Sequence, residues 1–187
     1  MRSVRETKER WRHVAKKSSP VGTPALRVLN SAGVEYELFE YEHSATMEHG
    51  YALDTSAVLG IEPALIFKTL LTECDARPVV AVMPASSQLS LKALAKAAGA
   101  KNAAMMNPAQ AEKITGYVTG GISPLGQRKL YPTFIDESAL THERILVSGG
   151  KRNLSVALRA QDLALLTNAQ FFAIAADTSS NTKNSAQ

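Results

Sequence analysis

Residues 65–83 read LIFKTLLTECDARPVVAVM and hold two apolar runs on either side of a short polar break. The first run, Leu65–Thr72, and the second, Pro78–Met83, each have the length of a strand. The segment Asp75-Ala76-Arg77 between them carries residues suited to a turn. The stretch therefore predicts a β-hairpin.

Helix boundaries are the clearest signals on both sides of this hairpin. Thr23-Pro24 begins a helix that Gly33 ends, because threonine caps helices and proline is tolerated at their first position. Asn107-Pro108 begins another, which ends near Gly116. Further helices are predicted at 51–59, 91–98 and 162–167, and further strands at 34–41, 103–106, 133–136, 144–147, 154–158 and 171–174. Because helices and strands mix without strict alternation, the predicted class is α+β with a mixed sheet.

The 187 residues suit one compact domain with a tail at each end. Residues 1–22 form a basic extension that we expect to be disordered, the domain covers 23–176, and 177–187 form a second disordered tail. Residues 1–20 carry seven basic and two acidic side chains, a net charge of +5 against +4 for the whole chain. The remainder is therefore close to neutral. The basic extension is either a solvated tail or a weak attractor of phosphates.

Several function classes are excluded by what the sequence lacks. No apolar run approaches the roughly 18 residues that span a bilayer, and no nucleotide-binding or hydrolase motif is present. The four histidines show no metal-ligand spacing, so neither a metal nor a cofactor is expected. The single cysteine, Cys74, rules out an intramolecular disulfide and fits a cytoplasmic setting.

Lys68 is the first candidate for chemistry. On a strand it shares a face with Ile66 and Leu70, and desolvation between aliphatic side chains lowers the pKa of an ammonium. The alternative is a lysine whose stem packs on the sheet while its charge reaches water.

Two glycine-containing segments are the other candidates. The run Gly120–Gly126 offers backbone N–H groups that hold a phosphate or a carbonyl oxygen, or else it is only a tight connection. The run Ser148–Arg152 has a hydroxyl and two cations suited to an RNA end, or else it is a hairpin turn with solvated charges.

These pieces together resemble one family. The resemblance rests on strings that occur in order over residues 23–175: Thr23-Pro24-Ala25, Tyr41-Glu42-His43, Phe67-Lys68-Thr69-Leu70-Leu71, the run 116–127 (GYVTGGISPLGQ) and Val147-Ser148-Gly149-Gly150-Lys151-Arg152. They are similar to the YbaK/EbsC proteins, the cysteinyl-tRNA(Pro) deacylases related to the editing insertion domain of bacterial prolyl-tRNA synthetases.

The resemblance implies a mixed β-sheet, curled into a barrel-like shape and flanked by helices. It implies removal of cysteine from proline tRNA, with mischarged tRNA(Pro) and prolyl-tRNA synthetase as partners and neither DNA nor a membrane. The family's essential lysine falls on Lys68, its active-site tyrosine on Tyr41, and its pocket glycine and serine on Gly120 and Ser148. We expect Gly121 to act with Gly120. The remaining expected substrate-binding residues are His43, Ser123, Gly149, Lys151, Arg152 and Ser155.

One departure from the family pattern leaves the substrate open. The family usually has Gly-Leu-Asp after the basic pair, whereas this chain has Asn153-Leu154-Ser155. A serine accepts a hydrogen bond but supplies no negative charge. Two alternatives to a cysteine editor therefore remain: an editor of another aminoacyl-tRNA, such as Ala-tRNA(Pro), that uses water, and a module that binds tRNA or a synthetase without catalysis.

Overall fold

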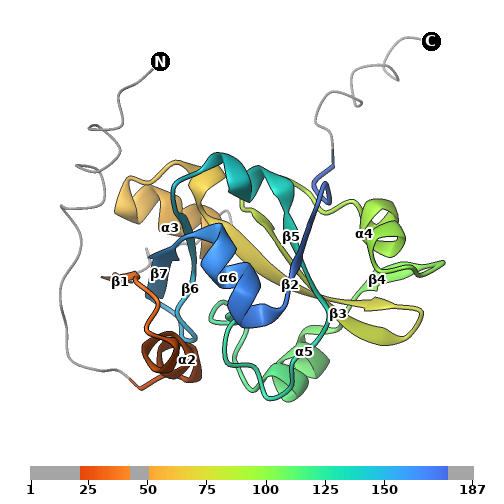
Figure 1. Cartoon of the computed structure of the whole chain (residues 1–187), viewed down its shortest axis with the longest axis horizontal. Coiled ribbons are helices and arrows are strands. Elements are labelled where there is room, and N and C mark those ends of the chain that lie inside the picture. Colours follow the sequence, from red (N-terminus) through yellow and green to blue (C-terminus); the bar gives the residue numbers. More distant parts are fainter. Residues whose placement is uncertain (1–21, 43–50, 177–187) are drawn as a thin grey trace, which may run out of the picture.

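The computed structural model describes residues 22–42 and 51–176 of the chain (Figure 1). Most of the predicted basic extension, the predicted C-terminal tail and His43 lie outside the described residues. In chain order the elements are α2 (Pro24–Ala32), β1 (Glu37–Glu40), α3 (Tyr51–Leu59), η1 (Pro63–Leu65), β2 (Phe67–Cys74), β3 (Arg77–Pro84), α4 (Leu91–Ala97), β4 (Ala103–Met105), α5 (Pro108–Thr115), β5 (Thr133–Asp136), η2 (Glu137–Thr141), β6 (Ile145–Ser148), β7 (Leu154–Leu158), α6 (Ala160–Thr167) and β8 (Gln170–Phe172).

The predicted hairpin is confirmed as the pair β2 and β3, in register from Phe67 opposite Pro84 to Cys74 opposite Arg77. Its turn is shorter than predicted, because only Asp75 and Ala76 lie outside the strands, both with positive φ. Two-residue turns with positive φ at both positions match the twist of the flanking strands. The Asp75 carboxylate accepts hydrogen bonds from the backbone N–H groups of residues 101 and 102, which ties the turn to the start of β4.

Strand pairing gives two sheets, with the orders β1-β7-β6 and β4-β2-β3-β5-β8. The first is antiparallel, and the second is mixed because β3 and β8 both run parallel to β5. A parallel bridge between Ile66 and Leu146 brings the start of β2 against β6. The predicted α+β class, with a mixed sheet and flanking helices, is confirmed (Figure 1). The two sheets form no closed ring among the described strands, so the barrel-like curl stays a prediction.

The predicted helix caps are confirmed. The Thr23 hydroxyl accepts a hydrogen bond from the backbone N–H of Leu26, and the Asn107 side chain accepts one from Ala109. Gly33 and Gly116 end their helices in the left-handed conformation. The predicted strand 34–41 is shorter, covering Glu37–Glu40, because the backbone N–H of Val34 bonds back to Leu29 and completes the helix end.

Hydrophobic packing covers both faces of the five-stranded sheet. On β3, Val80 and Val82 belong to a core shared with α2, α5 and α6, while Val79, Ala81 and Met83 pack with α4. A third cluster joins β1 and β7 to the residues around the start of β2. The candidate site lies beside the first residues of β2, next to this third cluster. Across the described ranges, no helix has the length and apolarity needed to cross a membrane.

Candidate active site

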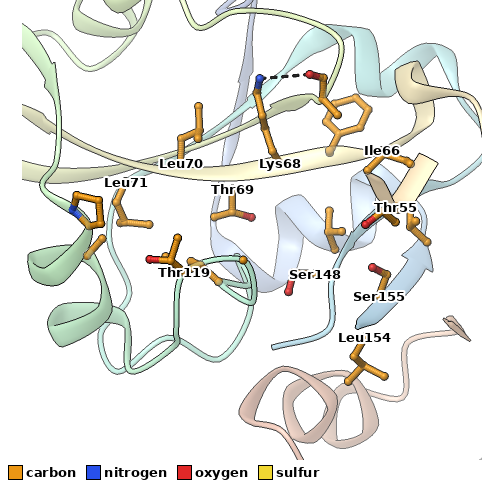
Figure 2. Close-up of a pocket in the computed structure, with 18 of the residues that line it drawn as sticks. Thr55, Ile66, Lys68, Thr69, Leu70, Leu71, Thr119, Ser148, Leu154 and Ser155 are labelled. Atoms are coloured by element: carbon orange, nitrogen blue, oxygen red, sulfur yellow. Dashed lines mark hydrogen bonds between the residues drawn. The ribbon is translucent and has the colours of Figure 1, made fainter. Parts of the chain in front are cut away.

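A cavity of about 410 Å³ lies beside β2, next to the bridge between Ile66 and Leu146. Its walls come from β2, β6, β7, the start of α5 and the glycine-rich run, together with Tyr41 and Thr55 (Figure 2). Most of the lining side chains are apolar, and the polar ones are few. A cavity of this size and lining is typical of sites that enclose a small molecule or one end of a larger one.

Lys68 lines this cavity from β2, and its ammonium donates hydrogen bonds to the backbone carbonyls of Ser87 at 2.6 Å and Ala85 at 3.3 Å. Burial lowers the pKa of Lys68, as predicted from its apolar strand. No carboxylate in the described part of the chain forms an ion pair with Lys68. Among the described residues, the site therefore holds a partly desolvated positive charge that is offset by the dipoles of two backbone carbonyls.

Tyr41 and Ser155 meet at the cavity wall. The Tyr41 hydroxyl lies 2.9 Å from Ser155 Oγ and 3.1 Å from Thr55 Oγ1. Burial raises the pKa of Tyr41, so its phenol is neutral at physiological pH. Ser148 lies directly across the strand pair from Ser155, on the same face of the sheet. The wall therefore presents a group of uncharged hydroxyls where the family usually places an acid.

The glycine-rich run contributes Gly120 to the cavity but not Gly121. The Gly121 N–H is already donated to the carbonyl of Val118. A Cβ at Gly121 would lie 2.8 Å from the backbone nitrogen of Arg152 and the backbone carbon of Lys151. Gly121 thus lets two loops pack backbone to backbone, and the expectation that its N–H acts on substrate together with Gly120 stays a prediction.

Two further predicted residues, Ser123 and Gly149, are absent from the cavity lining. Ser123 is fully buried and its hydroxyl accepts a hydrogen bond from the N–H of Leu125, so it has no route to substrate. Gly149 packs on Leu154, and its carbonyl accepts a hydrogen bond from the Thr23 hydroxyl. These residues support the loops structurally, and their assignment as substrate-binding residues stays a prediction.

The two predicted cations, Lys151 and Arg152, flank the glycine-rich run. Arg152 donates a hydrogen bond to the carbonyl of Thr119, which lines the cavity, and Lys151 lies 3.7 Å from a carboxylate oxygen of Glu40. The backbone N–H of Thr119 is bonded to the Glu112 carboxylate. Contacts from both sides therefore fix the Thr119–Gly120 segment at the cavity.

Three threonines of the cavity lining were not among the site residues predicted from the sequence: Thr55, Thr69 and Thr119. Thr69 could have been identified from the sequence. It follows Lys68 on the predicted strand, and neighbouring residues of a strand point to opposite sides. Figure 2 shows Lys68 leaving one side of β2 while Thr69 leaves the other, toward Thr119 and Ser148. Both sides of β2 are reached by one cavity because this part of the strand has no neighbour on its outer edge.

Charged catalytic groups are scarce in the described lining, which contains no histidine, cysteine or carboxylate. Cys74 is buried at the far end of β2, and burial raises the pKa of its thiol. No group of three histidine, cysteine or acidic side chains gathers in the described ranges to hold a metal. The site can bind and orient a small polar group, and its one cation can stabilise negative charge.

The fold and the cavity together define a small α+β domain that positions its ligand with hydroxyls, backbone groups and one lysine. A family model described as an aminoacyl-tRNA editing domain matches residues 49–166, more than half of the chain. The chain therefore belongs to the aminoacyl-tRNA editing domain family, and its enzyme class is that of the editing deacylases. The resemblance drawn from the sequence is confirmed.

One curated relative and one solved structure are similar to the chain over most of its length. It is 41% identical over 159 residues to an Enterococcus faecalis (strain ATCC 700802 / V583) protein named "Putative Cys-tRNA(Pro)/Cys-tRNA(Cys) deacylase EbsC", covering 84% of this chain and 96% of the relative. A crystal structure of "a putative trans-editing enzyme for prolyl tRNA synthetase" aligns with a TM-score of 0.72 at 22% identity, covering 86% of this chain and 100% of that one. At that identity the second likeness shows the fold alone.

We expect Gly121→Ala to lower the free energy of unfolding by roughly 1–3 kcal/mol, the usual cost of overpacking. The added methyl group would meet backbone atoms of residues 151 and 152, which cannot turn away as a side chain can. Urea unfolding of both proteins measures the change. Gly22→Ala is the matched control, since among the described residues beyond its chain neighbours its Cβ would come no closer than 3.8 Å to any atom, the nearest being the end of the flexible Arg27 side chain. Equal stability of Gly121→Ala and wild type would contradict the packing role.

Proposed function

We propose that the chain removes cysteine from mischarged Cys-tRNA(Pro), with the acceptor end of the tRNA entering the cavity beside β2. The observation that carries this proposal is the 41% identity, over most of both chains, to a relative named for deacylation of Cys-tRNA(Pro) and Cys-tRNA(Cys). The cavity supports it because its volume suits a small amino acid attached to one end of a larger ligand.

In the proposed mechanism the substrate supplies its own nucleophile. The cysteine sulfur attacks the ester carbonyl carbon, the bond from that carbon to the ribose oxygen breaks, and the thiol proton passes to the departing oxygen. A cyclic thioester leaves, and water then opens it to free cysteine. The absence of histidine, cysteine and carboxylate side chains from the described lining supports this route, because the protein has to supply orientation rather than a nucleophile.

The residue roles follow from charge and position. Lys68 supplies the positive charge that stabilises the developing oxyanion or holds the terminal ribose and phosphate, and the N–H of Gly120 polarises the carbonyl. The hydroxyls of Tyr41, Ser148 and Ser155 orient the aminoacyl group. Lys151 and Arg152 contact the backbone of the acceptor end.

A second candidate substrate is an alanyl ester that reacts with water. The specific observation that favours it is the neutral cluster of Tyr41, Thr55 and Ser155, since three hydroxyls can hold a water molecule without repelling an attacking oxygen. Separate tRNA(Pro) samples charged with cysteine, alanine or serine, each with and without prolyl-tRNA synthetase, distinguish the candidates. We expect the cysteinyl ester to be lost fastest; faster loss of the alanyl ester would favour the second candidate.

We also expect Tyr41→Phe to lower kcat/KM for Cys-tRNA(Pro) by roughly tenfold, the worth of one hydrogen bond in a closed site. The phenol oxygen is hydrogen-bonded to both Ser155 and Thr55, so its removal takes away a contact with each. Tyr36→Phe is the control, because it removes a hydroxyl bonded to Asn30 at an exposed position outside the cavity lining. If the two variants are equally active, Tyr41 has no part in the site.

A further inference from the structure

Thr69 carries a feature that the proposed mechanism does not use. Its Oγ1 is the one buried side-chain oxygen or nitrogen without a hydrogen-bond partner in the part of the chain that the structure describes. Figure 2 shows its side chain on the side of β2 that faces Thr119 and Ser148, within the cavity lining. A buried hydroxyl that has given up water without a replacement costs free energy, so such groups are rare, and one in a cavity lining is a candidate for contact with a ligand.

The backbone of Thr69 is open on the same side. Along β2 the backbone groups of even-numbered residues face β3, because Ile66 accepts a hydrogen bond from Ala85. Those of odd-numbered residues face the outer edge, where Leu71 accepts a hydrogen bond from Met106. On that edge β4 pairs only with residues 72–74, and the bridge to β6 lies at residue 66. The carbonyl of Thr69 therefore points away from β3, into the space between the bridge at residue 66 and the strand β4. The cavity occupies this space.

These two oxygens form an acceptor pair from a single residue. Four other hydroxyls of the wall each already have a protein partner, since Ser148 Oγ accepts a hydrogen bond from Gly150 and Tyr41 bonds both Ser155 and Thr55. The carbonyls beside Lys68 are occupied by its ammonium. An amino group can satisfy both oxygens of Thr69, because it brings several N–H donors where a thiol is only a weak donor.

We propose that Thr69 is the anchor for the α-amino group of the aminoacyl ester, which donates to its Oγ1 and to its backbone carbonyl. The inference rests on the proposed function and deepens it by assigning the part of the substrate that all amino acids share. Such an anchor sets the orientation of the ester while leaving the choice of side chain to the rest of the cavity. Loss of the hydroxyl should therefore slow the cysteinyl, alanyl and seryl esters by a similar factor.

The test compares Cys-tRNA(Pro) with its 3-mercaptopropionyl analogue, which lacks only the amino group. With Cys-tRNA(Pro), Thr69→Val should lower kcat/KM roughly 10- to 100-fold, the factor that a hydrogen bond to a charged donor supplies. Thr69→Ser, which keeps the hydroxyl, should restore most of the activity. With the analogue, wild type and Thr69→Val should react at equal rates, a result that loss of structure alone would not give.

Thr72→Val is the matched control, because it removes a buried hydroxyl from the same strand, one that is bonded to Val79 and lies outside the cavity lining. It should leave kcat/KM unchanged. Undiminished activity of Thr69→Val on Cys-tRNA(Pro), or the same loss on both substrates, would overturn the inference. So would a wild-type enzyme that does not distinguish the two substrates, a comparison that needs no variant. A wild-type chain that leaves Cys-tRNA(Pro) intact would instead contradict the proposed function itself.

Discussion

Replacing Lys68 with alanine is expected to lower the single-turnover rate of Cys-tRNA(Pro) deacylation by about 100-fold or more, the typical cost of removing one preorganised electrostatic group. The ammonium is the only cation in the described cavity lining, and burial keeps it from being screened as a surface charge would be. Quenched-flow or hand-sampled loss of the aminoacyl ester, with enzyme in excess, measures the rate.

Lys68→Ala also removes the contacts with the carbonyls of Ala85 and Ser87, so controls are needed for general loss of charge and for loss of structure. Lys96→Ala removes an exposed cation from α4 and should retain full activity. Thermal unfolding of Lys68→Ala should show a folded protein. Because burial lowers the pKa of Lys68, the charged form is lost at a lower pH than for an ordinary lysine. Wild-type activity, corrected for spontaneous hydrolysis, should therefore fall as pH rises through that pKa. Near-wild-type activity of Lys68→Ala would rule out the proposed role.

The second large effect concerns the substrate rather than the protein. Ser-tRNA(Pro) and 2-aminobutyryl-tRNA(Pro) should be deacylated at least about 100-fold more slowly than Cys-tRNA(Pro), since intramolecular attack has the advantage of a high effective concentration. Serine replaces the sulfur with a poorer nucleophile, and 2-aminobutyrate replaces it with a methyl group of similar size. Parallel time courses with one enzyme preparation give the ratios. Equal rates for cysteine and serine would indicate an activated water.

Local chemistry explains why the elements were predictable. Helix caps at Thr23 and Asn107 and the polar break at Asp75 act within a few residues, so the sequence around them is sufficient. The strand 34–41 was overestimated because one backbone N–H, that of Val34, is used to end the preceding helix.

The site was predicted less completely because its glycines serve two purposes that the sequence does not separate. A glycine that admits a ligand and a glycine that admits another backbone look alike, and only the approach of residues 151 and 152 assigns Gly121 to the second kind. Thr69 was overlooked for another reason. Whether Thr69 faces the cavity depends on which part of the edge of β2 lacks a partner strand. This is set by strands that begin more than 30 residues away.

The proposed activity depends most directly on whether the cavity turns substrate over. The decisive measurement incubates Cys-tRNA(Pro), in large excess over the wild-type chain, and counts cysteine released per enzyme molecule. The account predicts many turnovers per enzyme, with release well above the spontaneous rate. An ester that survives as long as in buffer, or longer because the protein protects it, would identify a binding module and contradict the account.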